Sequence, residues 1–335
     1  MPKEITHILF SDATFNLLEK NNLKLANIIE DNLDFYHLGC ISVDSFYYNL
    51  KLPFDKPYYT HAGDMIHGAE GNDTALAFRN CCEYLKNNKN EKNFDKKLAF
   101  ITGFVTHMAM DINFHPYVYY FSGNYYDDEP SKRVDAMMKH RLIEAWIDLY
   151  LLDKMNLSLD KFNSLKNIEK NKYDNYEVME FLCKFFSEAW NIKEEIVFPF
   201  KRGYNIQIFL NNYFMGNKNV KAFFRLLNDI FDNKLRDYLA LFYPDNVKDI
   251  PNYIVNFGNY IHPVTGKKFE GSIHDIWENA LKLSFNFLKS INDYIFEDLS
   301  KNDFEYIFRG YSLDVGLEGV KVYEVKHFAP WNLVP

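Results

Sequence analysis

Two short segments, about thirty residues apart, place metal-binding side chains at helical spacing. The first contains His107, Asp111 and His115, and the second contains His140 and Glu144. Residues four apart lie nearly above one another on one face of an α-helix, so each segment aligns imidazole and carboxylate groups in one stripe. Zn²⁺ binds these nitrogen and oxygen ligands in a compact shell. The pattern predicts a zinc site and favours a hydrolytic metalloenzyme.

The elements that must position these side chains are expected to be helices. The first motif helix is predicted over residues 96–115, ending before Pro116 because proline disfavours the continuation of a helix. The second is predicted over residues 132–154, with Ser131 as its N-cap. A buried polar network between two helices is the structural alternative to a metal site, and it would need a partner for every polar group.

The rest of the chain is mostly helical in pattern. Further helices are predicted over residues 5–29, 74–88, 157–169, 174–191, 205–213, 218–241 and 272–297. Residues 36–74 contain several glycines and prolines and are predicted to form a long irregular connection, a kind of segment that is often functional. Residues 320–325 alternate with period two and follow three glycines, which predicts a small hairpin. We expect an all-α, compact multi-helix bundle over residues 1–299, with a short C-terminal β-hairpin appendage in the tail, residues 300–335.

Composition excludes some classes of protein. The 335 residues are 47% hydrophobic, which is enough for a large core, and the net charge of −8 argues against general nucleic-acid binding. The residues before His7 contain no apolar run after a basic start, so neither a signal peptide nor a transmembrane segment is predicted. The four cysteines lack C-x-x-C spacing. We expect a cytoplasmic protein of bacterial origin, and the sequence does not fix its oligomeric state.

The order of the motifs resembles that of the bacterial zinc-dependent phospholipase C family, to which the fungal zinc single-strand nucleases are related. That family has an early His, an Asp in the first long loop, a His soon after, H-x-x-x-D with a further His, and then H-x-x-x-E. The matching residues here are His7, Asp44, His61, His107, Asp111, His115, His140 and Glu144. A P-x-T-G motif before the last long helix also matches, at residues 263–266. The resemblance covers residues 5–297, and chance explains linked motifs in this order poorly.

The resemblance implies two or three zinc ions per chain. The first ion would be held by the side chains of Asp44, His61, His107 and Asp111, and the second by those of His115, His140 and Glu144. A third would use His7 and share Asp111 as a bridge, although the secreted members complete this site with an N-terminal Trp and no Trp precedes His7 here.

Two residues in one short stretch compete for one ligand position. His61 and His67 could each bind the first metal, and the order of the family motifs favours His61. His67 and Asp64 would then line the substrate pocket.

The implied activity is hydrolysis of a phospholipid head-group bond or another phosphodiester by metal-activated water. The catalytic residues would be Asp44, as a ligand or general base, and Asp111, as the carboxylate between metals. A nuclease-like activity on single-stranded nucleic acid and a non-enzymatic metal-binding scaffold are the alternatives. Aromatic residues between 46 and 59 would suit a lipid-facing rim, but core packing is the favoured interpretation. The tail is too short for a separate lipid-binding sandwich domain of about 100 residues.

Overall fold

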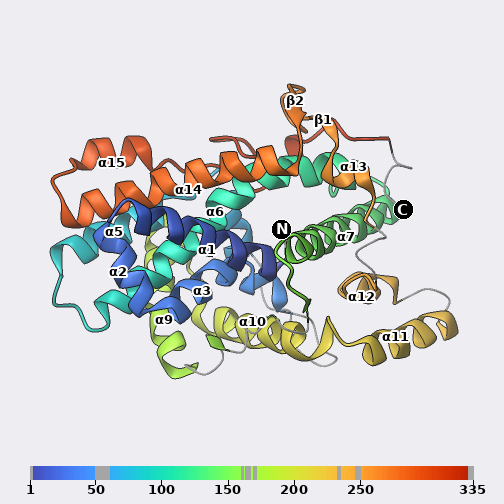
Figure 1. The fold of residues 1–335 in the computed structure, drawn as a ribbon, viewed down its shortest axis with the longest axis horizontal. Helices are drawn as coiled ribbons and strands as arrows, with labels where there is room; N and C mark the ends of the chain where they lie inside the picture. The colour runs from blue at the N-terminus through green and yellow to red at the C-terminus, as the bar shows by residue number, and fades with distance from the viewer. Residues whose placement is uncertain are drawn as a thin grey trace.

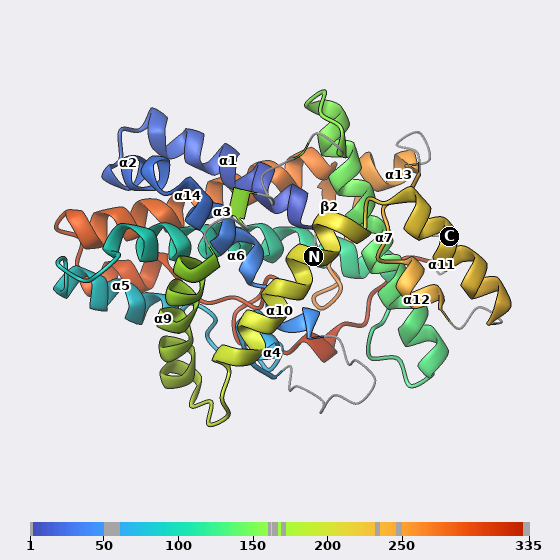
Figure 2. The same ribbon diagram turned by 90° about the horizontal axis from the view of Figure 1, so that it is seen from below.

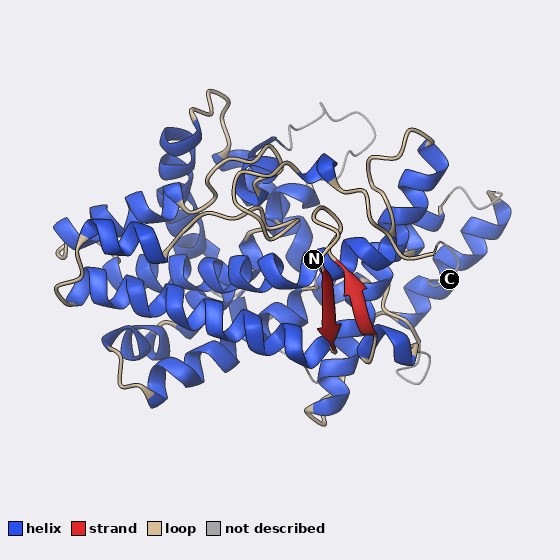
Figure 3. Cartoon of the chain, turned by 90° about the horizontal axis from the view of Figure 1, so that it is seen from above, coloured by secondary structure: helices blue, strands red, loops and turns tan. Residues whose placement is uncertain are grey.

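The computed structural model describes residues 3–49, 61–159, 162, 167–168, 172–231, 235–245 and 250–330. Within these ranges helices dominate, and a single two-stranded hairpin is the only sheet (Figure 3). The α-helices are α1 (Glu4–Lys20), α2 (Lys24–Asp31), α3 (Leu33–Ser42), α4 (His61–His67), α5 (Leu76–Asn87), α6 (Phe94–Ser122), α7 (Pro130–Lys154), α9 (Lys172–Trp190), α10 (Val197–Phe209), α11 (Lys218–Ile230), α12 (Arg236–Leu239), α13 (Asn252–Val255), α14 (Ile273–Phe296) and α15 (Lys301–Ile307). Three short elements are the 3-10 helices η1 (Ser45–Tyr48) and η5 (Val322–Glu324) and the π-helical turn η3 (Leu210–Phe214). The predicted all-α class with one small hairpin is confirmed.

Helix α6 is the centre of the bundle, and α1, α3, α7 and α14 pack around it (Figure 1). Nearly every side chain from Lys97 to Ser122 is buried, as expected for a helix surrounded by others. The predicted end at His115 is wrong, because the helix continues through Pro116 for almost two more turns. Proline has no N–H to donate to the carbonyl four residues earlier. Gly316 of the tail packs against that carbonyl, and a Cβ on Gly316 would lie only 2.3 Å from Ile112 O.

Helices α3 and α6 approach each other at a pair of glycines. A Cβ on Gly39 would lie 2.0 Å from Phe100 O, and one on Gly103 would lie 1.9 Å from Tyr36 O. Only residues without a side chain permit two backbones to come this close. The contact sets the end of α3, and Asp44 just after it, against the middle of α6. The expectation of an irregular connection from residue 36 is therefore wrong for the part up to Ser42, which is helical.

The ends of three other helices differ from the predictions. The predicted helix over residues 5–29 is divided into α1 and α2, with Asn22 at φ 53° between them. Helix α7 begins at Pro130, with Glu129 rather than Ser131 at the N-cap position. The predicted helix over residues 218–241 ends at Ile230, and α12 is a separate element.

The hairpin lies before the last long helix and not in the tail. Strand β1 (Gly258–Ile261) pairs antiparallel with β2 (Lys268–Gly271), with Ile261 opposite Lys268. The Pro-Val-Thr-Gly segment forms the connecting turn, and Gly266 supplies a φ of 72°. The strand predicted over residues 320–325 is wrong, since η5 occupies part of it. Alternating side chains make a strand only when a second strand pairs with it, and here Val322 N donates to Ala69 O instead.

The tail packs on the helical bundle rather than apart from it. Phe304, Phe308 and Leu313 belong to the same hydrophobic core as α6, and the rings of Phe308 and Phe287 are 4.9 Å apart. The division at residue 299 stays a prediction. Of the aromatic segment 46–59, Phe46 is buried and stacks on Phe200, whereas residues 50–60 lie outside the described residues. None of the described helices is both long enough and apolar enough to cross a membrane.

Candidate metal centre

Four buried side chains from three elements meet beside the middle of α6. His107 and Asp111 come from α6, Asp44 follows α3, and His67 ends α4. His107 Nε2 lies 2.9 Å from Asp111 Oδ2 and 3.8 Å from Asp44 Oδ1, and His67 Nε2 lies 3.3 Å from the same Asp44 oxygen. Candidate ligand atoms of His67, His107 and Asp111 lie within 4.8 Å of one another. Such a set of two imidazoles and two carboxylates matches the ligands that zinc takes.

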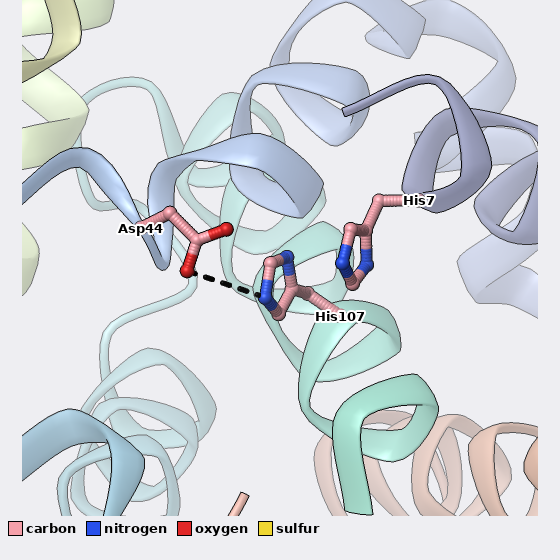
Figure 4. Close-up of side chains that lie close together, drawn as sticks. All are labelled: His7, Asp44 and His107. Atoms are coloured by element: carbon pink, nitrogen blue, oxygen red, sulfur yellow. Dashed lines mark ion pairs between the residues drawn. The ribbon is translucent and has the colours of Figure 1, made fainter. Parts of the chain in front are cut away.

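His7, in the first turn of α1, joins this cluster. Its ring stacks on that of His107, with centroids 3.5 Å apart and planes 2° from parallel (Figure 4). Figure 4 also shows Asp44 on the other side of His107, and candidate ligand atoms of all three residues lie within 4.8 Å of one another. His7 Nε2 is 3.5 Å from Asp111 Oδ1. Asp111 is therefore close to His7, as the expectation of a shared carboxylate requires.

A second cluster forms where α6 faces α7. His115, His140 and Glu144 are all buried, and one candidate ligand atom of each lies within 4.8 Å of the others. His140 Nε2 lies 2.7 Å from Glu144 Oε1. Spacing of four residues places both on one face of α7. The structure therefore brings together the three residues expected to share a metal.

Asp111 lies between the two clusters. Its Oδ1 is 3.5 Å from His7 Nε2 and 3.9 Å from His115 Nε2, while its Oδ2 contacts His107. The side chain is fully buried at 0% exposure. A carboxylate in this position can contact two metal ions at once, which is the arrangement of two-metal hydrolases.

Three of the histidines are oriented by backbone carbonyls. The Nδ1–H of His67 donates to Gly63 O (2.8 Å), that of His107 donates to Cys40 O (2.6 Å), and that of His115 donates to Leu313 O (2.8 Å). Each bond fixes the ring so that Nε2 faces the carboxylates. Histidines that bind metals characteristically donate their second ring nitrogen in this way. The surroundings of the cluster therefore hold these imidazoles in an orientation suited to binding a metal.

Charge differs between the two clusters. Burial lowers the pKa of His67, but the carboxylates of Asp44, at 3.3 Å, and Asp314 outweigh this effect and raise the pKa to about 9. Burial also acts to lower the pKa of His107, but the nearby carboxylates of Asp111 and Asp44 outweigh burial and raise the pKa. Burial lowers the pKa of both His115 and His140, which keeps them neutral. The first cluster thus favours positive charge, and the second offers imidazoles in the form that binds metals.

The structure brings His67 to the cluster where the sequence order favoured His61. The two residues stand at opposite ends of α4, and six residues correspond to about 600° of helical rotation, which places them on different faces. His61 is half-buried and belongs to none of the metal-type clusters among the described residues. Asp64, the other expected pocket residue, is partly exposed and accepts a hydrogen bond from Tyr47 Oη (3.2 Å). Burial raises its pKa.

Asp314 is a residue of this site that sequence reasoning missed. Its Oδ1 lies 3.7 Å from His115 Nδ1, and burial raises its pKa to about 6. Leu313, just before it, also donates its N–H to His67 O (2.8 Å) while accepting from His115. No motif marks these residues. The glycines around them were the one visible signal, and with the alternation over residues 320–325 they led to the prediction of a small hairpin instead.

The polar atoms of the centre fit a bound metal. Asp44 Oδ1, both Asp111 oxygens, His107 Nε2 and His115 Nε2 are buried without a hydrogen bond of ordinary geometry. Buried polar atoms are nearly always satisfied, so a group of them converging on one region requires an explanation. Zinc would satisfy all of these atoms, because carboxylates and neutral imidazoles each have a lone pair to donate. The raised pKa of His107 means that metal binding would release a proton from its ring.

The comparison with known families agrees with this geometry. Residues 6–196 match the family described as zinc-dependent phospholipase C. The match covers more than half of the chain, and the chain belongs to the zinc-dependent phospholipase C family. At the level of the family, this is a zinc-dependent phosphodiesterase. No curated protein and no solved structure gives a significant match.

Proposed function

We propose that this protein is a zinc-dependent phosphodiesterase that hydrolyses the head-group phosphodiester of a phospholipid. The observation that carries the proposal is the convergence of His67, His107 and His115 Nε2 on buried carboxylates, with each Nδ1 tied to a backbone carbonyl. Such second-ring hydrogen bonds orient ligands for a metal. The family match supports the same chemistry.

The first zinc would be held by Asp44, His67, His107 and Asp111, with His7 beside them. The second would be held by His115, His140 and Glu144, with Asp111 between the two. Zinc bound in such a site lowers the pKa of water to about 7 and polarises a phosphoryl oxygen. Whether a third ion binds at His7 is decided by measuring the stoichiometry.

A side chain of the protein would take up the proton that is released when water attacks the phosphodiester. A water molecule attacks phosphorus while the bond from phosphorus to the alcohol oxygen breaks, which yields a phosphomonoester and an alcohol. Asp44 would bind zinc through one carboxylate oxygen and accept the proton that the water loses on the other, because its carboxylate lies against the cluster. The same proton then neutralises the departing alkoxide. A general base of this kind contributes typically about 10²–10⁴-fold in rate.

The zinc content of two matched variants tests the metal assignment. His61→Ala and His67→Ala change the same residue type on the same short helix, but only His67 contacts Asp44. We expect two or three zinc per chain in the wild type and in His61→Ala, measured by elemental analysis, and at least one fewer in His67→Ala. Loss of zinc in His61→Ala with retention in His67→Ala would reverse the assignment.

Activity is tested on four substrates with the zinc-loaded protein. We expect release of phosphorylated head group from phosphatidylcholine vesicles and cleavage of bis(p-nitrophenyl) phosphate, with no cleavage of p-nitrophenyl phosphate, a monoester. Asp44→Asn should lower both activities by about 10²-fold or more. Cleavage of single-stranded DNA without lipid hydrolysis would assign the protein to the nuclease-like alternative. Full zinc occupancy without turnover of any diester would indicate a metal-binding scaffold.

A further inference from the structure

Helix α11 has its polar and apolar faces reversed relative to an ordinary surface helix. Lys221 and Asn228 are buried, whereas Phe223, Leu226 and Ile230 are 56%, 58% and 62% exposed. Residues 221 and 228 lie on one side of the helix, and residues 223, 226 and 230 lie on the opposite side. Helices on the surface of a globular protein usually turn such an apolar stripe toward the core.

The buried contacts hold this orientation in place. Lys221 Nζ donates to Tyr243 O (2.8 Å) and to Asp245 Oδ1 (2.9 Å), and Asn228 Oδ1 accepts from Leu235 N (3.0 Å). Phe224 adds an aromatic contact with Phe242, with ring centroids 5.7 Å apart. Turning the apolar stripe inward would break these contacts and would leave the Lys221 ammonium without its partners. The exposed apolar face is thus a fixed feature of the fold.

Neighbouring elements extend the exposed apolar surface. Phe198 and Phe209 on α10 and Tyr213 on η3 are each more than half exposed. Figure 1 places α10 and α11 along the lower edge of the molecule, and Figure 2, seen from below, shows both toward the viewer. The elements that carry these exposed apolar side chains therefore lie on one side of the molecule, and a large exposed apolar surface marks an interaction site.

A phospholipid bilayer fits this side of the molecule best. Aromatic and aliphatic side chains beside basic residues are typical of helices that lie in a membrane interface. Helix α11 carries three basic residues and one acidic residue, Asp229, in a chain whose net charge is −8, although Asp245 pairs with two of the bases. Lys218 at its start is exposed. The local charge is compatible with anionic lipid, and the apolar stripe supplies most of the attraction.

We propose that the exposed face of α11, together with the exposed aromatic residues of α10 and η3, docks this protein on a phospholipid bilayer. The inference rests on the proposed function, since the substrate of that function is assembled in bilayers. The docking elements lie outside the residues that match the family, 6–196. The helices that carry or directly precede the candidate metal ligands, α1, α3, α4, α6 and α7, all fall within or overlap that range. Docking through α11 would hold the enzyme at the surface from which it takes its substrate.

The test is flotation of the zinc-loaded full chain with phosphatidylcholine vesicles, with and without about 20 mol% phosphatidylserine, an anionic lipid of the cytoplasmic leaflet. The triple variant Phe223→Ser, Leu226→Ser, Ile230→Ser should lose binding at least tenfold, with its activity on bis(p-nitrophenyl) phosphate unchanged. Tyr306→Ser with Tyr323→Ser is the matched control, because it removes exposed rings outside α10 and α11 and should bind as the wild type does.

Each outcome separates docking from catalysis. Equal vesicle binding by the wild type and the triple variant, or no binding by the wild type, would overturn the docking proposal. A dimer in sedimentation experiments that the triple variant abolishes, without vesicle binding, would assign the face to a second copy of the chain and would also overturn it. Vesicle binding through α11 with no diester hydrolysis would overturn the proposed function and support the docking face.

Discussion

One buried carboxylate outside the candidate metal ligands, that of Asp148, connects two helices. Asp148 lies on α7, one turn beyond Glu144, and is fully buried. It accepts hydrogen bonds from Thr6 N (2.9 Å), Thr6 Oγ1 and Tyr243 Oη (2.7 Å). Thr6 belongs to the first turn of α1, where N–H groups lack the usual acceptor four residues earlier, and its N–H also contacts Lys3 O at 3.1 Å. Asp148 therefore fastens the start of α1 to α7 and fixes the residue that precedes His7.

The pKa of Asp148 leads to a prediction about stability and pH. Burial raises it to about 6, above the ordinary value of 3.8. Because the folded-state pKa is the higher one, the stabilising contribution is complete below about pH 4 and is lost as the pH rises through about 6. Asp148→Asn cannot ionise. Relative to the wild type, its free energy of unfolding should therefore increase by about 2–3 kcal/mol between pH 4 and pH 7.

Urea unfolding at both pH values would measure this change. Asp153→Asn, which removes an exposed carboxylate from the same helix, is the control and should follow the wild type. If the free energies of unfolding of the wild type and Asp148→Asn differ by the same amount at pH 4 and pH 7, the assignment of a raised pKa is contradicted.

Among the elements, the tail supplies backbone hydrogen bonds to two of the candidate ligand residues. One residue, Leu313, binds the backbone of His67 and the ring of His115, which come from α4 and α6. The tail reaches this position because Gly316 fits against Ile112 O, the carbonyl that Pro116 leaves without its helical donor. The proline in α6 and the glycine in the tail thus form one contact, although 200 residues separate them.

Two glycines in the tail provide a matched pair of substitutions. Gly316 and Gly319 have φ of 65° and 69°, so alanine at either position costs about 1–2 kcal/mol of backbone strain. Only Gly316 faces a close neighbour, whereas nothing lies within 4 Å of a Cβ on Gly319. We expect Gly316→Ala to lose a further 1–3 kcal/mol, roughly, of unfolding free energy and to release zinc faster to a chelator.

Thermal unfolding and the rate of zinc transfer to a chromogenic chelator would compare the two variants. Equal behaviour of Gly316→Ala and Gly319→Ala in both measurements would show that the contact with α6 does not matter for the site.

At the scale of the whole molecule, the centre joins parts of the chain that are distant in sequence. Helices α1, α4, α6 and α7 and the tail all contribute side chains or backbone groups to it. A ligand that binds only the folded state stabilises it, by about 2.7 kcal/mol at a free concentration 100 times its dissociation constant. Removing zinc with a chelator should therefore lower the melting temperature by several degrees, roughly, without loss of helix.

Calorimetry with and without zinc, and circular dichroism of the stripped protein, would test this prediction. Asp111→Ala removes the carboxylate between the clusters, and its melting temperature should respond little to zinc. A wild-type melting temperature that does not depend on zinc would contradict a role for the metal in holding these elements together.

Part of the site could be predicted from local spacing alone. The four-residue intervals among His107, Asp111 and His115, and between His140 and Glu144, fix a common face as soon as the helices form. The order of the motifs also indicated the family and the all-α class. The expected cytoplasmic location and the number of metal ions stay predictions.

The tertiary structure decided the remainder, because packing and not spacing selects among candidates. The choice between His61 and His67 depends on which face of α4 turns toward Asp44. Helix α6 continues past Pro116 because other helices and the tail enclose it, which outweighs the local cost of proline. Asp314 reaches His115, which lies 199 residues earlier in the chain, only when the tail folds back. Contacts of that kind leave no local pattern, since they arise when distant segments exclude water from one shared core.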